Sequence, residues 1–261
     1  MKNLNNSSLN TGITDHKTIP SSGFLITTYT NNSPGVLSIL AQRSATYTYF
    51  GPFLSLAPLP EDLIQWEATH MQGDLLTPLK VFMEWVHSYI TQYAEGLDYY
   101  WFEIRATKGS DSFVIPRWHT DGIFFEERKD DQWKLATCIL GPGTLFLKDG
   151  VEAREIVDTE NRIIVDELDR EEVAEENRDK IWWQKTEVMR KILARKFEGW
   201  QTVQPRFGEV ALFKVGSNGA AVHSEPNSLG DRVFISVLPG TEAELRDMAQ
   251  RWGMPWSRAL E

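Results

Sequence analysis

The chain is poor in cysteine and in long apolar runs. Its single cysteine, Cys138, excludes an internal disulfide and a zinc site built from cysteines, and it suits a reducing compartment. No stretch approaches the ~18 uninterrupted apolar residues that a transmembrane helix needs. The N-terminal segment also lacks the apolar region of a secretory signal. We therefore expect a cytoplasmic protein with no membrane partner.

Positive charge is scarce as well. There are 27 Lys and Arg residues against 37 Asp and Glu residues, which gives a formal net charge of -10. An acidic chain repels the phosphate backbone, so we expect no nucleic-acid partner and take a small molecule as the default substrate. The length of 261 residues suits one sizeable core. We expect a mobile Asn- and Ser-rich tail over 1–20 and a single domain over 21–261, with an oligomeric state that the sequence leaves open.

Helices are expected near both ends of the chain. "PLPEDLIQWEATHM" begins with prolines and acids, as helices often do. In "TPLKVFMEWVHSYITQYAEG" apolar residues recur at spacings of three and four, which predicts a helix with one buried face, ending near Gly96. In the last segment, Thr241 and Glu244 form the pattern of a capping box, which predicts a C-terminal helix.

Between these helices the pattern changes to short β-branched and aromatic runs separated by glycine and proline. The runs are "DYYWFEIRAT" (98–107), "LATCILG" (135–141), "GTLFLKDG" (143–150), "GEVALFKVG" (208–216) and "RVFISVLPG" (232–240). They are typical of a mostly antiparallel sheet system, with "GPGT" as a turn between two strands. An acidic helical insertion, about 152–200, interrupts this β core of about 98–240. The expected fold is α+β: a sandwich or barrel with helical supports.

The segment "IPRWHTDG" contains a candidate metal-ligand pair. His119 and Asp121 stand two residues apart, so they share a face if the chain is extended. His223 follows the strand "GEVALFKVG" and precedes "RVFISV". Two histidines and one carboxylate can hold Fe(II) and leave three coordination positions open, as in non-haem iron oxygenases. The alternative is a loop histidine beside a turn aspartate.

Arg232 begins the last strand and suggests an anion site. Alternation places Arg232, Phe234 and Ser236 on one face of this strand. If that face lines a barrel, the buried arginine needs an anionic partner, and a dicarboxylate co-substrate would supply one. The Ser236 hydroxyl could add a hydrogen bond, and Thr137 could face the same interior. The alternative is an arginine at a sheet edge, paired with Asp231 or Glu225.

The phrases "RWHTDG", "LGPGTLFL", "GEVALFKVG", "AVHSEP" and "DRVFISVLPG", in this order, resemble the Fe(II)/2-oxoglutarate-dependent dioxygenase superfamily. They resemble even more closely a bacterial family known only as a domain of unknown function. The resemblance covers about 98–240 and implies a double-stranded β-helix core, a jelly-roll of cupin-like type. It implies that His119, Asp121 and His223 ligate a catalytic iron and that Arg232 binds the distal carboxylate of 2-oxoglutarate.

Two positions depart from the common pattern of that superfamily. Ala106, in "RATKG", stands where many members have a tyrosine, and Phe234 stands where many have a serine. The expected activity is the hydroxylation of a small organic molecule with molecular oxygen, giving succinate and CO2. Two alternatives stay open: a non-catalytic metal- or ligand-binding β-helix that acts as a sensor or interaction module, and a cupin-type metal enzyme that does not use 2-oxoglutarate.

Overall fold

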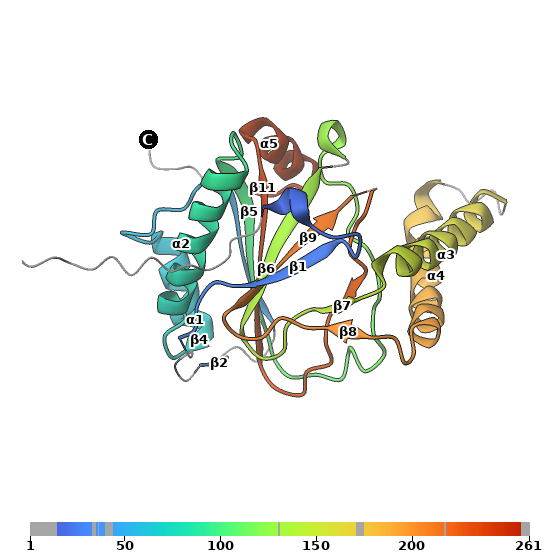
Figure 1. Ribbon diagram of the computed structural model, residues 1–261, viewed down its shortest axis with the longest axis horizontal. Helices are drawn as coiled ribbons and strands as arrows, with labels where there is room; N and C mark the ends of the chain where they lie inside the picture. Colours follow the sequence, from blue (N-terminus) through green and yellow to red (C-terminus); the bar gives the residue numbers. More distant parts are fainter. Residues whose placement is uncertain are drawn as a thin grey trace, which may run out of the picture.

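The computed structural model of the chain describes residues 15–32, 35, 37–39, 44–129, 131–170, 175–216 and 218–256. Over these residues the fold is α+β, as predicted, with antiparallel sheets and five α-helices (Figure 1). No helix in the described ranges is long and apolar enough to cross a membrane.

The largest sheet has six strands in the order β1-β9-β6-β11-β5-β3, and every neighbouring pair is antiparallel. The five runs of the predicted β core each contribute a strand, four of them to this sheet and one to a smaller sheet. The bounds of the six strands are β1 Phe24–Thr28, β3 Ala45–Pro52, β5 Tyr99–Thr107, β6 Gln132–Leu140, β9 Glu209–Val215 and β11 Arg232–Gly240.

A smaller sheet has the order β10-β7-β8, with β10 at His223–Ser224, β7 at Leu145–Leu147 and β8 at Thr202–Val203. An isolated antiparallel bridge between His119 and His223 adds the segment around His119 to its edge. A two-stranded sheet of β2 (Ser38–Ile39) and β4 (Met71–Gln72) lies apart from both.

Two helices cover one face of the large sheet (Figure 1). They are α1 (Glu61–His70) and α2 (Leu76–Tyr93). The periodicity of α2 predicted one buried face: Leu79, Phe82, Val86 and Tyr89 are buried, whereas Tyr93, the last residue of the pattern, is only half-buried. Because helix α2 ends at Tyr93, Gly96 lies beyond it, in a turn with φ of 85°. The helix face and the sheet face together form the larger apolar core.

The alternation predicted for the last strand is confirmed. Val233, Ile235 and Val237 of β11 are buried in the core beneath α2. Phe234 and Leu238 instead join a second apolar cluster on the opposite face of the large sheet. This second face, between the two sheets, is therefore the one that Arg232 and Ser236 share.

The insertion between β7 and β8 is helical, as predicted. It consists of α3 (Gly150–Arg170) and α4 (Glu175–Lys196), which project from the small sheet as a pair (Figure 1). Leu193 and Phe197 at the end of this insertion pack on Trp118, so its base is joined to the segment that carries His119. The last helix, α5 (Glu242–Arg251), begins with the predicted capping box of Thr241 and Glu244.

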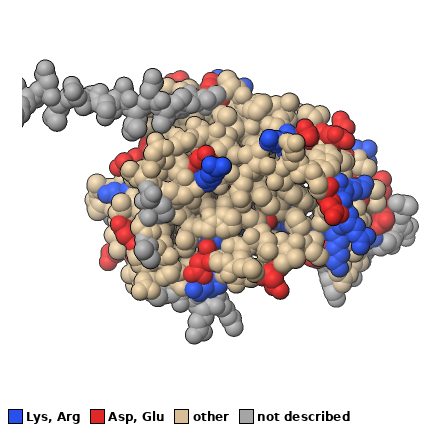
Figure 2. Space-filling view, turned by 60° about the horizontal axis from the view of Figure 1, so that its bottom comes forward, with Lys and Arg blue, Asp and Glu red and all other residues tan. Residues whose placement is uncertain are grey.

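The first described residues pack against the domain. His16, in the short 3-10 helix η1 (His16–Thr18), is buried and stacks on Trp133 with ring centroids 5.0 Å apart. A second short 3-10 helix, η2 (Glu126–Arg128), precedes β6. The tail was expected over 1–20; of this range, 1–14 lies outside the described residues. Figure 2 shows one face of the molecule, on which acidic and basic side chains are interspersed along the rim.

Gly141 is required by the backbone of the "GPGT" connection between β6 and β7. Its φ is 76°, and a Cβ added there would lie 2.6 Å from the carbonyl oxygen of Asp231. We expect Gly141→Ala to lower the free energy of unfolding by about 2–4 kcal/mol, because the new side chain meets both an unfavourable φ and rigid backbone. Denaturant unfolding monitored by circular dichroism measures this change.

Gly230→Ala is the matched control for this prediction. A Cβ added at Gly230 has no neighbour within 4 Å, so the unfolding free energy should stay within ~0.5 kcal/mol of the parent value. Equal losses in the two variants would show that close packing at Gly141 is not the cause.

Candidate metal centre

The backbone brings His119 and His223 side by side. The amide of His119 donates to the carbonyl of His223 at 3.0 Å, and the amide of His223 donates back to the carbonyl of His119 at 2.9 Å. This pair of hydrogen bonds fixes the two residues directly opposite each other. Their imidazole rings are 4.3 Å apart between centroids. Residues 104 positions apart in sequence thus form one site, and Asp121 follows two residues after His119.

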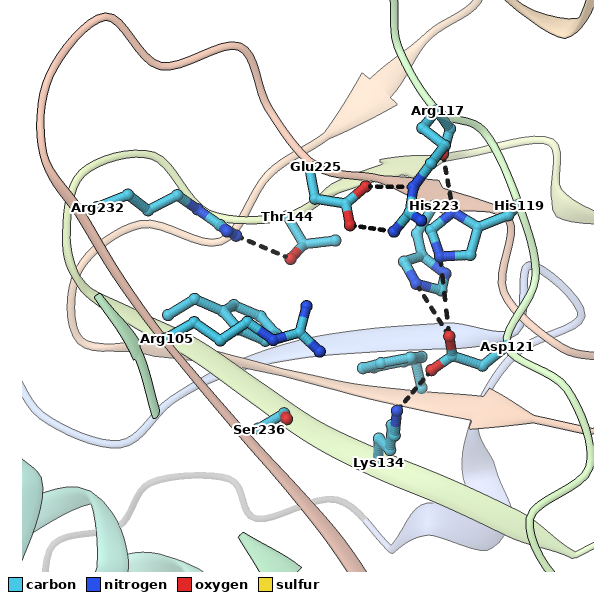
Figure 3. A pocket seen from close by; sticks show the side chains of 12 residues that line it. Arg105, Arg117, His119, Asp121, Lys134, Thr144, His223, Glu225, Arg232 and Ser236 are labelled. Atoms are coloured by element: carbon cyan, nitrogen blue, oxygen red, sulfur yellow. Dashed lines mark hydrogen bonds and ion pairs between the residues drawn. The ribbon is translucent and has the colours of Figure 1, made fainter. Parts of the chain in front are cut away.

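Three ligand atoms converge at this site (Figure 3). Oδ1 of Asp121 lies 3.8 Å from Nε2 of His119 and 3.7 Å from Nε2 of His223. One ligand atom from each of these residues lies within 4.8 Å of those of the other two. The group could therefore hold a metal ion, with two nitrogen ligands and one oxygen ligand.

Backbone carbonyls fix the orientation of both rings. Nδ1 of His119 lies 2.7 Å from the carbonyl oxygen of Arg117, and Nδ1 of His223 lies 3.0 Å from that of Ala221. Since a carbonyl oxygen only accepts hydrogen bonds, Nδ1 carries the proton in each neutral ring. The lone pair is then on Nε2, which is the atom that points at Asp121. This is the arrangement in which metal-binding histidines are commonly held.

Lys134 holds the other oxygen of the carboxylate. Its Nζ donates to Oδ2 of Asp121 at 2.8 Å, and it lies over the rings of Phe124 and Trp101 at 4.4 and 4.9 Å. Burial alone would raise the pKa of Asp121, but Lys134 and the two histidines hold that pKa well below its usual range. Asp121 is thus ionised, and its Oδ1 remains free to bind a cation.

His119, the more exposed of the two histidines of the site, is kept neutral by its surroundings. Burial, followed by the neighbouring His223, lowers the pKa of His119 to about 4. A neutral imidazole is the form that binds a metal. Protonation of His119 therefore does not compete with metal binding near neutral pH.

An ion pair stands beside the two histidines. Arg117 and Glu225 lie two residues from His119 and His223, and the guanidinium of Arg117 binds both carboxylate oxygens of Glu225. The Arg117 amide also donates to Oγ of Ser224 at 2.9 Å. Burial raises the pKa of Glu225, but His119 and Arg117 outweigh it and lower that pKa to about 2. The pair links the two ligand segments.

The three residues line one pocket with a volume of about 90 Å³. A cavity needs about 10–15 Å³ on this measure to hold one water, so this partly open pocket has room for several waters or for a small ligand. Figure 3 shows the side chains around it. The complete lining is Arg105, Arg117, His119, Asp121, Lys134, Thr144, Phe213, His223, Glu225, Arg232, Phe234 and Ser236.

Arg232 lies in this pocket and not at an ion-paired edge. Its Nε donates to the carbonyl of Pro142 at 2.9 Å, and Nη2 donates to Oγ1 of Thr144 at 3.4 Å. The two carboxylates that could have paired with it have other partners. Asp231 binds Lys108 at 3.0 Å, and Glu225 binds Arg117. Among the described residues, Arg232 forms no ion pair, so its charge is available to a ligand.

The two other predicted co-substrate residues lie on opposite faces. Ser236 is nearly buried and lines the pocket. Thr137 is absent from the lining: its hydroxyl donates to the carbonyl of Glu209 at 2.8 Å. Its neighbours Leu135 and Ile139, two residues away on β6, belong to the core beneath α2. The structure therefore does not bring Thr137 to the site.

Several lining residues were not predicted from the sequence. Lys134, Arg105 and Thr144 line the pocket, and Glu225 was considered only as a partner for Arg232. Lys134 is the only charged residue of strand β6 (Gln132–Leu140), a signal that could have marked it. The position of Arg105 in the pocket follows only from the register of β5 and β11, in which Arg105 is paired with Phe234.

Ala106, which stands where many members of the superfamily have a tyrosine, does not face the pocket. Ala106 is fully buried in the core beneath α2, so this position points away from the pocket. A tyrosine there would not reach the candidate metal site on the present backbone. Trp118, beside His119, is buried against Phe197 and serves packing.

No model of a protein family matches this chain, and no curated protein matches it. The fold and the site therefore define a class only at a coarse level: an α+β protein with a His-Asp-His group that could hold a metal ion.

Proposed function

We propose that this protein is an Fe(II)- and 2-oxoglutarate-dependent dioxygenase that hydroxylates a small organic molecule. The observation that carries the proposal is a juxtaposition within one small pocket. A group of two histidines and one carboxylate, with its nitrogen lone pairs directed inward, shares this pocket with an arginine that forms no ion pair among the described residues. The first suits Fe(II), and the second suits the far carboxylate of a dicarboxylic acid.

The path of the chain supports a double-stranded β-helix as the finer description of the core. From β5 onward, the segments enter the two sheets in a regular alternation: β5 in the large sheet, the His119 bridge in the small one, then β6, the pair β7 and β8, then β9, β10 and β11. The large sheet thereby gains the order β9-β6-β11-β5 and the small one the order β8-β7-β10. A jelly-roll of two facing antiparallel sheets has this kind of path.

The chemistry divides between the bound groups and the protein. Iron, 2-oxoglutarate and dioxygen supply the oxidation: one oxygen atom enters the substrate as a hydroxyl group and the other enters succinate, while CO2 is released. His119, Asp121 and His223 would hold the iron. Arg232, aided by Ser236, would hold the distal carboxylate. Lys134 binds Oδ2 of Asp121, which would leave Oδ1 for the metal, and the ring of Phe213 packs beside His223.

Anaerobic titration with Fe(II) and 2-oxoglutarate tests the proposal. A keto acid that chelates iron in an open three-ligand site gives a weak visible charge-transfer band, and we expect this band in the parent protein. We expect it to disappear in His223→Ala, because one of the two nitrogen ligands is lost. His70→Ala, a histidine of α1 outside the pocket, is the control and should retain the band.

The titration also separates the competing functions. Iron binding without the band would contradict the use of 2-oxoglutarate and favour a cupin-like metal enzyme or a metal-dependent sensor. If the protein binds no iron at all, His119 and Asp121 are not metal ligands, and the alternative of a loop histidine beside a turn aspartate is favoured.

A further inference from the structure

We propose that Arg105 is a second anion-binding residue of this pocket and that the substrate of the enzyme is a small carboxylic acid, whose carboxylate Arg105 receives. This inference rests on the proposed function, since it assigns Arg232 to the co-substrate and Arg105 to the substrate. It is carried by the position of Arg105, by the charge of the pocket and by the separate attachment of the two arginines.

Arg105 is fixed in place with its charged end in the pocket. It lies on β5 directly opposite Phe234 of β11, and its Cζ lies 5.8 Å from the centroid of that ring. Its Nε binds the carboxylate of Glu103, two residues earlier on the same face of the strand. Figure 3 shows the guanidinium of Arg105 in the open space of the pocket, directed toward the side that carries Asp121 and the histidines.

The terminal nitrogens of Arg105 remain available. Glu103 occupies Nε, and neither Nη atom donates to a protein acceptor in the described part of the chain. Two parallel N–H groups on the end of a planar guanidinium match the two oxygens of a carboxylate. Because Glu103 and Phe234 already order the side chain, little conformational entropy is lost when such a ligand binds.

The two arginines offer separate sites. Arg232 is attached to the carbonyl of Pro142 and to Thr144, in the connection after β6, whereas Arg105 is attached to Glu103 on β5. Both approach the ring of Phe234, with Cζ of Arg232 at 4.8 Å from its centroid. Figure 3 shows the two side chains as neighbours, with Arg105 nearer to Ser236 and Arg232 nearer to Thr144.

The excess of positive charge in the pocket favours the binding of more than one anion. Its lining has four cationic side chains and two carboxylates. Fe(II) adds two positive charges and the 2-oxoglutarate dianion adds two negative charges, so the two bound groups cancel and the cationic excess of the lining remains. Glu103, behind Arg105, offsets one charge. The Arg105 side chain is 46% exposed, so a ligand that enters from solvent can reach it, and the carboxylate of a substrate would offset the remaining positive charge.

The test uses simple acids and their uncharged counterparts as probes. Propanoate, benzoate and 3-phenylpropanoate, each beside its primary amide, are titrated anaerobically into the protein loaded with Fe(II) and 2-oxoglutarate, and the charge-transfer band is recorded. We expect at least one acid to perturb the band saturably, with its amide at least ~10-fold weaker. In Arg105→Gln the response to that acid should weaken by ~10-fold or more, and in Arg105→Lys by less.

The same titrations measure the affinity for 2-oxoglutarate itself. We expect Arg105→Gln to change it less than ~3-fold, in contrast to Arg232→Gln. Arg105→Gln leaves Glu103 as a buried carboxylate without its partner, so Glu103→Gln/Arg105→Gln is the companion variant that removes this charge. A response to the acid that is lost in both variants supports a role of Arg105 in binding and not in folding alone.

Each of the other outcomes contradicts one defined part of the proposal. If 2-oxoglutarate gives the band but no acid perturbs it, or if acids and amides act alike, the carboxylate-binding role is wrong and the proposed function stands. If Arg105→Gln weakens 2-oxoglutarate as strongly as Arg232→Gln does, Arg105 belongs to the co-substrate site. If the parent protein gives no band with 2-oxoglutarate, the proposed function fails first, and this inference fails with it.

Discussion

Asp121→Ala is expected to abolish the iron-dependent turnover of 2-oxoglutarate and to lower the affinity for Fe(II) by ~100-fold or more. Loss of residues that only support a metal ligand costs about 10–100-fold, and Asp121 would itself be the only charged ligand. Its Oδ1 is the point on which both Nε2 atoms converge, at 3.8 and 3.7 Å. Anaerobic Fe(II) titration and the release of succinate measure the two effects.

Asp121→Ala also removes the ion-pair partner of Lys134, so it affects the stability of the fold as well as metal binding. Lys134 is buried, and its Nζ would lose the 2.8 Å contact to Oδ2 of Asp121. An uncompensated buried cation destabilises the fold by several kcal/mol. Asp121→Ala/Lys134→Met removes that charge, and it should restore the unfolding free energy without restoring iron binding or turnover.

Two further variants complete this comparison. Lys134→Met alone keeps all three ligand atoms, so iron should still bind. Asp111→Ala, in the exposed part of the loop that leads to His119, is the control and should behave as the parent does. Turnover of 2-oxoglutarate that persists in Asp121→Ala would contradict the assignment of this carboxylate to the metal.

The parts of the fold that the sequence predicted are those with a clear local signal. The capping box at Thr241 and the buried face of α2 follow from spacing alone, and both are present. The alternation of the last strand placed Arg232 and Ser236 on one face correctly, because β11 pairs with β5 without a register shift from Arg232 to Gly240. The candidate ligands His119 and His223 were expected near each other from the strand order, and the structure brings them together.

The sequence failed where a strand is buried on both faces. Strand β6 is almost entirely buried, so hydrophobicity does not distinguish its pocket side from its helix side. Thr137 was expected inside the barrel, yet it is Lys134, three residues earlier, that reaches the pocket. Arg105 was missed for a related reason: its relation to Phe234 and Arg232 depends on the pairing of β5 with β11, which no local pattern encodes.

Ion pairs across long sequence distances were also beyond prediction. Glu225 was considered as a partner for Arg232, but it binds Arg117, which the bridge between His119 and His223 places opposite it. Asp231, the other candidate partner, binds Lys108, so Arg232 has no carboxylate partner among the described residues. Contacts between residues far apart in sequence therefore decide which arginine is available to a ligand.

Arg232→Gln is expected to raise the concentration of 2-oxoglutarate needed for half-saturation by about 10–100-fold. A charge-assisted pair between a guanidinium and a carboxylate contributes about 1.5–3 kcal/mol, and every 1.4 kcal/mol is a factor of ten in affinity. Fe(II) affinity should be unchanged, since Arg232 contacts Pro142 and Thr144 and none of the three ligands. The amplitude of the charge-transfer band against 2-oxoglutarate concentration gives the affinity directly.

Two variants define what Arg232 contributes. Arg232→Lys keeps the charge but loses the planar fork, so we expect an intermediate loss. Arg246→Gln, on the exposed face of α5, removes an arginine that pairs only with Glu242 among the described carboxylates, and it should leave 2-oxoglutarate binding unchanged. An unchanged affinity in Arg232→Gln, with iron still bound, would contradict the co-substrate role and favour a metal site that works without a keto acid. A loss confined to 2-oxoglutarate would instead separate the two halves of the pocket: histidines and Asp121 for the metal, Arg232 for the co-substrate.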